Sequence, residues 1–82
     1  MAKRNSQAYV IKIYCMKCNA FLYKYFKKGQ GHLVKCYKDG IIEDNTKGDL
    51  RCLQCGQLFA REVIYHNRLA NKIIQGKVYI RR

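Results

Sequence analysis

Hydrophobic and polar residues alternate over short stretches of this chain, and this alternation predicts strands rather than helices. Residues 7–14 (QAYVIKIY) and 20–26 (AFLYKYF) are rich in β-branched and aromatic residues, which favour strands. Residues 57–66 (QLFAREVIYH) alternate as well, and residues 77–82 (KVYIRR) predict a closing strand. No long stretch repeats with the 3.6-residue period of an amphipathic helix. The pattern therefore predicts a small β-rich fold.

The segment between residues 20 and 38 predicts a hairpin. Two glycines in residues 27–31 (KKGQG) indicate a turn, and residues 32–38 (HLVKCYK) have the composition of a strand. We therefore expect residues 22–26 to pair with residues 32–37. Alternation along the first of these strands places Phe21, Tyr23 and Tyr25 on one face and Leu22, Lys24 and Phe26 on the other.

Three other stretches complete the predicted organisation. Residues 39–49 are polar and predict a loop, with a short extended piece at Ile41–Ile42. Residues 67–76 (NRLANKIIQG) fit either one or two helical turns or an irregular strand. Residues 1–6 (MAKRNS) are polar and basic and predict a flexible arm. Residues 1–82 are expected to form one small domain, and a core this small commonly needs a staple such as a metal.

Four of the five cysteines form two Cys-x-x-Cys pairs with 33 residues between them. The pairs are Cys15–Cys18 and Cys52–Cys55. Two such pairs can supply four thiolates in a tetrahedral arrangement around zinc, so we expect one structural Zn²⁺. Asn19 and Gly56 follow the pairs and tolerate the left-handed backbone that each cysteine knuckle needs. Four protein ligands leave no open position for water, so catalysis at the metal is not expected.

The remaining cysteine and the histidines lack this spacing. Cys36 lies inside a predicted strand, where we expect a buried free thiol, with a role as an additional ligand as the alternative. His32 and His66 are expected at the surface or facing RNA. Three basic residues near the ligands are expected to offset the charge of the thiolates; they are Lys12, Lys17 and Arg51.

The two cysteine pairs and their flanking strands resemble the zinc-ribbon superfamily, which includes ribosomal proteins, transcription factors and RNA polymerase subunits. The resemblance covers about half of the chain, and residues 57–82 lie outside it. It implies a zinc ribbon of antiparallel hairpins and a role in nucleic-acid machinery of the ribosomal or transcription type.

Charge is distributed unevenly along the chain. Seventeen Lys and Arg face five Asp and Glu, which gives a net charge of +12. Four of the five acids lie in residues 39–49 with Lys47, so the rest of the chain carries sixteen bases against Glu62 alone. Such a field attracts polyanions such as RNA or DNA. We favour RNA because no long recognition helix for the major groove is apparent.

Candidate contacts to RNA fall in residues 24–38 and in the C-terminal segment. Lysines would neutralise phosphates, and an exposed tyrosine would stack on a base, with Tyr25 as the first choice and Tyr37 as the second. The alternative is that these aromatic residues form the core of the sheet. The candidates are Lys24, Tyr25, Lys27, Lys28, Lys35, Tyr37, Lys38, Arg61, Arg68, Lys72, Lys77, Arg81 and Arg82.

The sequence therefore predicts a zinc-ribbon protein that binds RNA, with ribosomal RNA as the expected target and ribosomal proteins as neighbours. Alternatives are a transcription accessory associated with DNA or RNA polymerase, and a protein adaptor that uses the acidic residues 39–49. Neither an enzyme nor a small-molecule substrate is expected, because no carboxylate pair or nucleophile–base set is visible. The chain shows no apolar run of a signal peptide or a membrane span, so we expect a cytoplasmic protein without a membrane partner.

Overall fold

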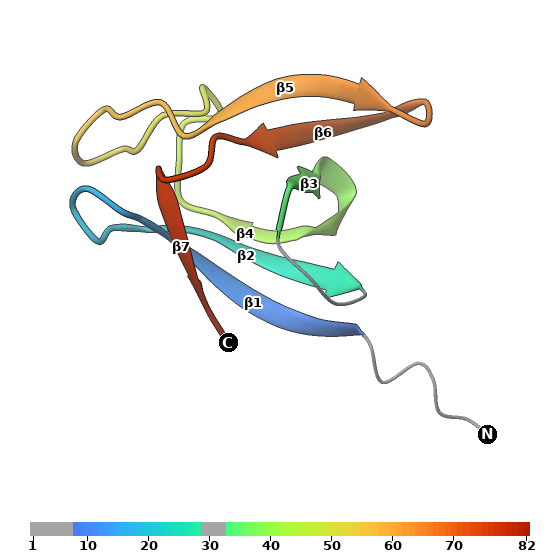
Figure 1. Cartoon of the computed structure of the whole chain (residues 1–82), viewed down its shortest axis with the longest axis horizontal. Coiled ribbons are helices and arrows are strands. Elements are labelled where there is room, and N and C mark those ends of the chain that lie inside the picture. The colour runs from blue at the N-terminus through green and yellow to red at the C-terminus, as the bar shows by residue number, and fades with distance from the viewer. Residues whose placement is uncertain (1–7, 29–32) are drawn as a thin grey trace.

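Two antiparallel sheets make up the part of the chain that the structure describes. This computed structural model describes residues 8–28 and 33–82. One sheet has the strand order β4-β2-β1-β7 and the other has the order β3-β6-β5 (Figure 1). The elements are β1 (Ala8–Cys15), β2 (Phe21–Lys28), β3 (Lys35–Tyr37), a short 3₁₀ turn η2 (Lys38–Gly40), β4 (Ile41–Asp44), β5 (Ala60–Tyr65), β6 (Arg68–Ile73) and β7 (Val78–Arg81). The predicted small β-rich fold is confirmed.

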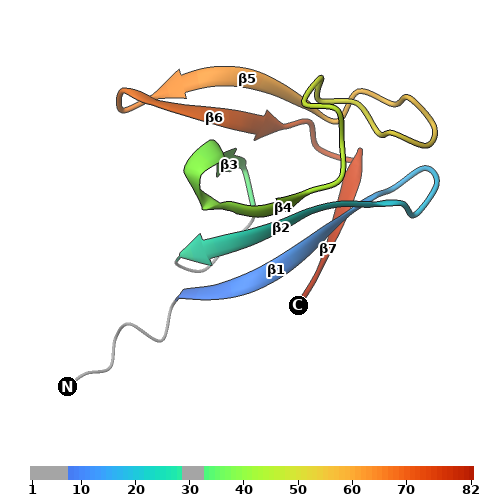
Figure 2. The same cartoon turned by 180° about the vertical axis from the view of Figure 1, so that it is seen from behind.

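The core lies between the two sheets, which face each other in both views (Figure 1, Figure 2). Ile11 and Ile13 of β1 point inward and are almost completely buried, while Lys12 between them is exposed. Tyr23 of β2 meets Phe59 edge to face, with ring centroids 5.4 Å apart. Because side chains alternate along a strand, the inward residues fix which side chains each sheet presents on its outer face.

Two buried tyrosines of β2 join the sheets by hydrogen bonds. Asn71 Nδ2 of β6 donates to Tyr23 Oη at 3.1 Å, and the backbone N–H of Tyr37 in β3 donates to Tyr25 Oη at 3.0 Å. A buried tyrosine requires such a partner for its hydroxyl. The prediction that Tyr25 is an exposed stacking ring is therefore wrong: its side chain is only 6% exposed because it faces the opposite sheet.

The expected hairpin between residues 22–26 and 32–37 does not form. Strand β2 pairs with β1 and with β4, and β3 pairs with β6 of the other sheet. Both edges of β2 are thus occupied, and β3 crosses the core instead, where Cys36 is fully buried. The strict alternation predicted for β2 also fails at one point. The register shifts opposite Ile13 and Tyr14, and both Leu22 and Tyr23 are buried.

The ambiguous residues 67–76 contain a strand rather than helical turns. Strand β6 pairs with β5 along its whole length, from Ala60↔Ile73 to Tyr65↔Arg68. His66 and Asn67 form the two-residue loop between them, with φ values of 51° and 61°. Two positive φ values are typical of a type I′ turn, whose twist matches that of the flanking strands. The closing strand predicted in residues 77–82 is confirmed as β7, which pairs with β1.

Some expectations fall on residues that the structure does not describe. They are the arm at residues 1–6, the glycines of the turn at residues 27–31, and His32. Within residues 8–28 and 33–82, no helix is long and apolar enough to cross a membrane.

Candidate metal centre and nucleic-acid interface

The first cysteine pair lies in the loop that joins β1 to β2. The N–H of Cys15 donates to the carbonyl of Ala20 at 2.8 Å, and the N–H of Asn19 donates to the carbonyl of Cys15 at 2.8 Å. Asn19 has a φ of 65°, the left-handed conformation that Asn tolerates better than most residues. These bonds close a tight knuckle that turns Cys15 and Cys18 toward the same point.

The second pair repeats this backbone pattern. The N–H of Cys52 donates to the carbonyl of Gln57, and the N–H of Gly56 donates to the carbonyl of Cys52, both at 2.9 Å. Gly56 has a φ of 78°, so the turn residue predicted after each pair is confirmed in both knuckles. Arg51 Nη1 also donates to the carbonyl of Gly56 at 3.2 Å, which ties the loop to the residue before it. Two similar knuckles therefore face each other from different parts of the chain.

The four sulfur atoms converge on one point. The Sγ atoms of Cys15, Cys18, Cys52 and Cys55 all lie within 4.8 Å of one another. Two of the distances are 3.6 Å (Cys15–Cys55) and 3.4 Å (Cys18–Cys52). A tetrahedral zinc with Zn–S bonds of ~2.3 Å would hold its sulfurs ~3.8 Å apart. The arrangement can therefore hold a metal ion, and a tetrahedral set of four thiolates suits zinc or iron.

The surroundings of the sulfur atoms lower the pKa of the Cys52 thiol and connect the centre to β7. Burial raises the pKa of the Cys52 thiol, but backbone hydrogen bonds from Cys55 and Gln54 outweigh it and lower the pKa to about 7. A thiolate is the form that binds a metal, so these hydrogen bonds favour metal binding by Cys52. Gln57 Nε2 lies 3.8 Å from Cys15 Sγ and 3.4 Å from the carbonyl of Lys77. Gln57 thus links the centre to the start of β7, a role that nothing in its sequence position indicates.

Cys36 is not part of this group. It is fully buried in β3, and burial raises its pKa to about 12. The prediction of a buried free thiol is confirmed. His66 is exposed at the β5–β6 turn, where its ring meets the ring of Tyr65 edge to face at 4.9 Å.

Several basic candidates share the outer surface of the β3-β6-β5 sheet, which we call the β6 face. It consists of the positions of these strands that alternate with the core-facing ones, which are Lys35, Tyr37, Arg61, Val63, Tyr65, Arg68, Ala70 and Lys72. Of these, Ala70 is fully buried. Strand pairing aligns Lys35, Lys72 and Arg61 in one row across the sheet. Tyr65 was missed by the sequence analysis, although it follows the same alternation as Arg61. None of these described outward positions carries a carboxylate.

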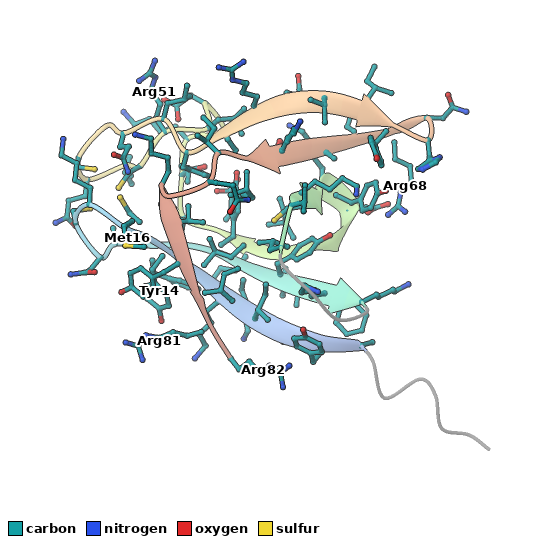
Figure 3. All side chains as sticks on the ribbon, viewed as in Figure 1. Tyr14, Met16, Arg51, Arg68, Arg81 and Arg82 are labelled. Carbon is teal, nitrogen blue, oxygen red and sulfur yellow. The ribbon has the colours of Figure 1, made fainter. Side chains whose placement is uncertain are left out.

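The tyrosine rings of the β6 face are covered by cations. Lys35 Nζ lies 4.2 Å from the ring centroid of Tyr65, and Arg68 Cζ lies 3.8 Å from that of Tyr37. Arg68 also forms an ion pair with Asp39 at 2.7 Å. The guanidinium is thereby held from two sides, at the end of the molecule opposite Met16 and Arg51 (Figure 3).

A groove of about 520 Å³ runs between β2 and β3 beside this face. Lys28, Lys35 and Arg68 line it, so cations from β2, β3 and β6 meet around one hollow. Asp39 lines it as well and is paired with Arg68. Lys27 also lines it, but its side chain is mostly buried, with Nζ 5.7 Å from the ring centroid of Tyr9. Sequence alternation alone could not show this, because the groove joins strands of different sheets.

The other basic candidates lie elsewhere. Lys38 is exposed and forms an ion pair with Glu62 at 2.7 Å. The guanidinium carbon of Arg82 lies 4.0 Å from the ring centroid of Tyr9, and Lys77 lies just before β7. Lys24 and Arg81 belong to the outer face of the other sheet. The structure therefore distributes the candidates over two faces rather than along one hairpin.

The acidic stretch is partly engaged within the chain. Asp39 pairs with Arg68, and Asp44 Oδ1 accepts hydrogen bonds from the N–H and the hydroxyl of Thr46. Asp49 Oδ1 accepts from the N–H of Arg51. These contacts shape the segment between β3 and the second knuckle.

Comparisons of the chain with protein-family models, with curated proteins and with solved structures found no match. The four-sulfur centre and the distribution of charge are therefore the basis for any functional conclusion.

Proposed function

We propose that this chain is a zinc-stabilised domain that binds RNA, with ribosomal RNA as the expected target. The observation that carries the RNA part is the β6 face. Its row of three cations, Lys35, Lys72 and Arg61, comes from three strands and contains no carboxylate among its described positions. Lysine and arginine side chains gathered in this way neutralise phosphates and release counterions.

The zinc part rests on the geometry of the four sulfur atoms. Their separations match a tetrahedral four-thiolate site, and each knuckle has the backbone turn that such a site requires. The role of the metal would be structural, because the four cysteines fill its coordination sphere. Elemental analysis of the purified protein tests this: one zinc per chain is expected, and iron or no metal would contradict it.

Salt-dependent binding tests the RNA part. We expect the affinity for RNA to fall steeply with salt. The triple variant Lys35→Gln, Lys72→Gln, Arg61→Gln should flatten that slope by ~0.7–0.9 for each phosphate that is no longer neutralised. The control replaces Lys17 and Lys47 by Gln, since both are exposed and lie outside the β6 face. The variant removes three positive charges and the control removes two, so an equal effect per charge removed would reduce the proposal to unspecific attraction.

The ribosomal target is tested separately by sedimentation of cell lysate. Co-migration of the protein with a ribosomal subunit at moderate salt is expected. Co-migration with RNA polymerase would instead support a transcription accessory, and migration with neither would remove the ribosomal target while leaving RNA binding to the test above.

A further inference from the structure

A second row of cations crosses the outer face of the β4-β2-β1-β7 sheet, which we call the β1 face. Lys12 of β1 has Lys24 of β2 as its cross-strand partner on one side and Arg81 of β7 on the other. Lys12 and Arg81 are exposed, and Lys24 is half-buried. The C-terminal strand therefore completes a row that begins in the first two strands.

This row is unfavourable for folding by itself. Neighbouring strands lie ~4.8 Å apart, and like charges directly opposite each other destabilise a sheet. Neither of the ion pairs found among the described residues involves these three cations. Glu43 is the cross-strand partner of Lys24 on the far side, but its carboxylate instead accepts a hydrogen bond from Asn45. A polyanion bound along the row would relieve this repulsion.

A row of aromatic rings lies beside the cations. Tyr14 follows Lys12 by two residues and faces the same side, with Tyr79 of β7 and Phe21 of β2 as its cross-strand partners. The rings of Tyr14 and Tyr79 are stacked, with centroids 5.3 Å apart and planes 12° apart, and the ring centroid of Phe21 lies 5.4 Å from that of Tyr14. All three residues are half-buried. Tyr14 and Arg81 lie close together on this side of the molecule (Figure 3).

The two rows have the spacing of the two halves of a nucleotide. Two residues along a strand span ~6.6 Å, which is comparable to the separation of a phosphate from its own base. Bases stack on exposed aromatic side chains irrespective of their sequence, while cations follow the backbone. A base-paired helix hides the faces of its bases, so only unpaired nucleotides offer both groups at once.

We propose that the β1 face binds unpaired nucleotides of RNA, with phosphates along Arg81, Lys12 and Lys24 and bases on the rings of Tyr79, Tyr14 and Phe21. This rests on the proposed function and adds a second surface and the form of RNA that it accepts. Lys12 is then a phosphate ligand rather than only a neighbour of the metal centre.

The test compares a single-stranded oligouridylate of about ten nucleotides with a duplex RNA of the same length. In the variant Tyr14→Leu with Tyr79→Leu, affinity for the single strand should fall at least about fivefold for each base that no longer stacks, with the salt slope unchanged. Duplex affinity should stay the same. The matched control is Tyr37→Leu with Tyr65→Leu on the β6 face, which should leave single-strand binding less affected.

The cation row provides a second readout that a structural role would not give. In the variant Lys12→Gln, Lys24→Gln, Arg81→Gln, the salt slope for the single strand should flatten by ~0.7 for each phosphate that is no longer neutralised. The melting temperature should hold or rise, because the repulsion within the row is removed. A lower melting temperature with unchanged RNA binding would overturn the proposal.

The outcomes separate this proposal from the proposed function. If the unmodified protein binds no RNA, the proposed function fails. If it binds RNA and both β1-face variants bind the single strand as tightly as it does, only the present proposal is overturned. Metal content and a melting transition confirm folding of each variant. If the double tyrosine variant does not fold, Tyr79→Leu on the edge strand β7 is measured alone, with the same criterion of about fivefold.

Discussion

The outer faces of the two sheets carry the same kinds of side chain, cations and aromatic rings, in different arrangements. Each sheet has a row of three cations on its outer face. The β6 face places Lys35 and Arg68 within 4.2 Å of the centroids of its tyrosine rings. On the β1 face Tyr14 and Tyr79 stack on each other, and Arg81 lies farther from a ring, at 5.7 Å from the centroid of Tyr79. Arg68 of the β6 face is also paired with Asp39. A ring that is covered closely by a cation offers less free surface to a base. We therefore propose that the β6 face contacts phosphates and that the β1 face contacts bases as well.

The largest effect should come from variants that remove a cysteine of the four-sulfur centre and so separate the two sheets. The first knuckle belongs to the β1–β2 hairpin, and the second lies before β5, so a metal ion bound by both links one sheet to the other. Because the binding free energy of such a metal is part of the folding free energy, Cys18→Ser or Cys55→Ser should leave a largely unfolded chain. Circular dichroism and the dispersion of the NMR spectrum measure this.

The matched control for these variants is Cys36→Ala, which removes a cysteine outside the four-sulfur group and should keep one metal per chain. A well-dispersed spectrum of the unmodified protein in excess chelator would show that the sheets stay together without metal.

A smaller effect is expected from the hydrogen bond that joins β2 to β3. Tyr25→Phe removes the acceptor for the N–H of Tyr37 and should reduce the free energy of unfolding by ~1–3 kcal/mol. Affinity of the folded protein for RNA should not change, because the Tyr25 side chain is buried. Denaturant unfolding and RNA titration measure the two quantities. Tyr65→Phe is the control: it keeps the ring at its exposed position on the β6 face and should alter neither quantity. A loss of RNA affinity in Tyr25→Phe alone would mean that the Tyr25 hydroxyl, or the position of β3 that it holds, contributes to RNA binding.

Local features of the structure were predictable from the sequence, and pairings between distant segments were not. The knuckles depend on cysteines three residues apart and on the turn residues Asn19 and Gly56, so their signal is complete within each motif. Alternation in β2 indicated two faces, but it could not show that Tyr25 is on the inner one. That depends on β3, which crosses to pair with β6.

The cation rows show the same limit. Lys12 and Arg81 lie near opposite ends of the chain, and only the pairing of β1 with β7 brings them side by side. The sequence placed Lys12 beside the metal ligands because Cys15 is close to it along the chain. In the fold, both cross-strand partners of Lys12 are cations. The charge around Lys12 therefore depends on strand pairing more than on the residues next to it in the sequence.

The packing between the sheets around Cys36 should tolerate a small change. Cys36→Ala removes one buried sulfur and should cost ~1–3 kcal/mol of unfolding free energy as a cavity substitution. Because burial raises the pKa of this thiol to about 12, it should react with a thiol reagent at pH 8 only after unfolding. Rapid reaction in the native, metal-loaded protein would contradict its burial between the sheets.

The smallest effects should come from replacing the acid that borders each face. These replacements test whether the two faces differ in their preference for duplex or single-stranded RNA. Asp39 holds Arg68 of the β6 face, and its hydrogen bond is the main reason that the pKa of Arg68 is raised. Glu43 lies beside Lys24 at the end of the cation row of the β1 face. Asp39→Asn should free one cation for phosphates and so strengthen binding to duplex and single-stranded RNA alike. Glu43→Gln should act mainly on the single strand, because only the β1 face combines its cations with stacked rings. Each change should steepen the salt slope by no more than ~0.7–0.9, the equivalent of one phosphate contact. If Glu43→Gln strengthened duplex binding as much as single-strand binding, the two faces would not differ in the RNA they accept.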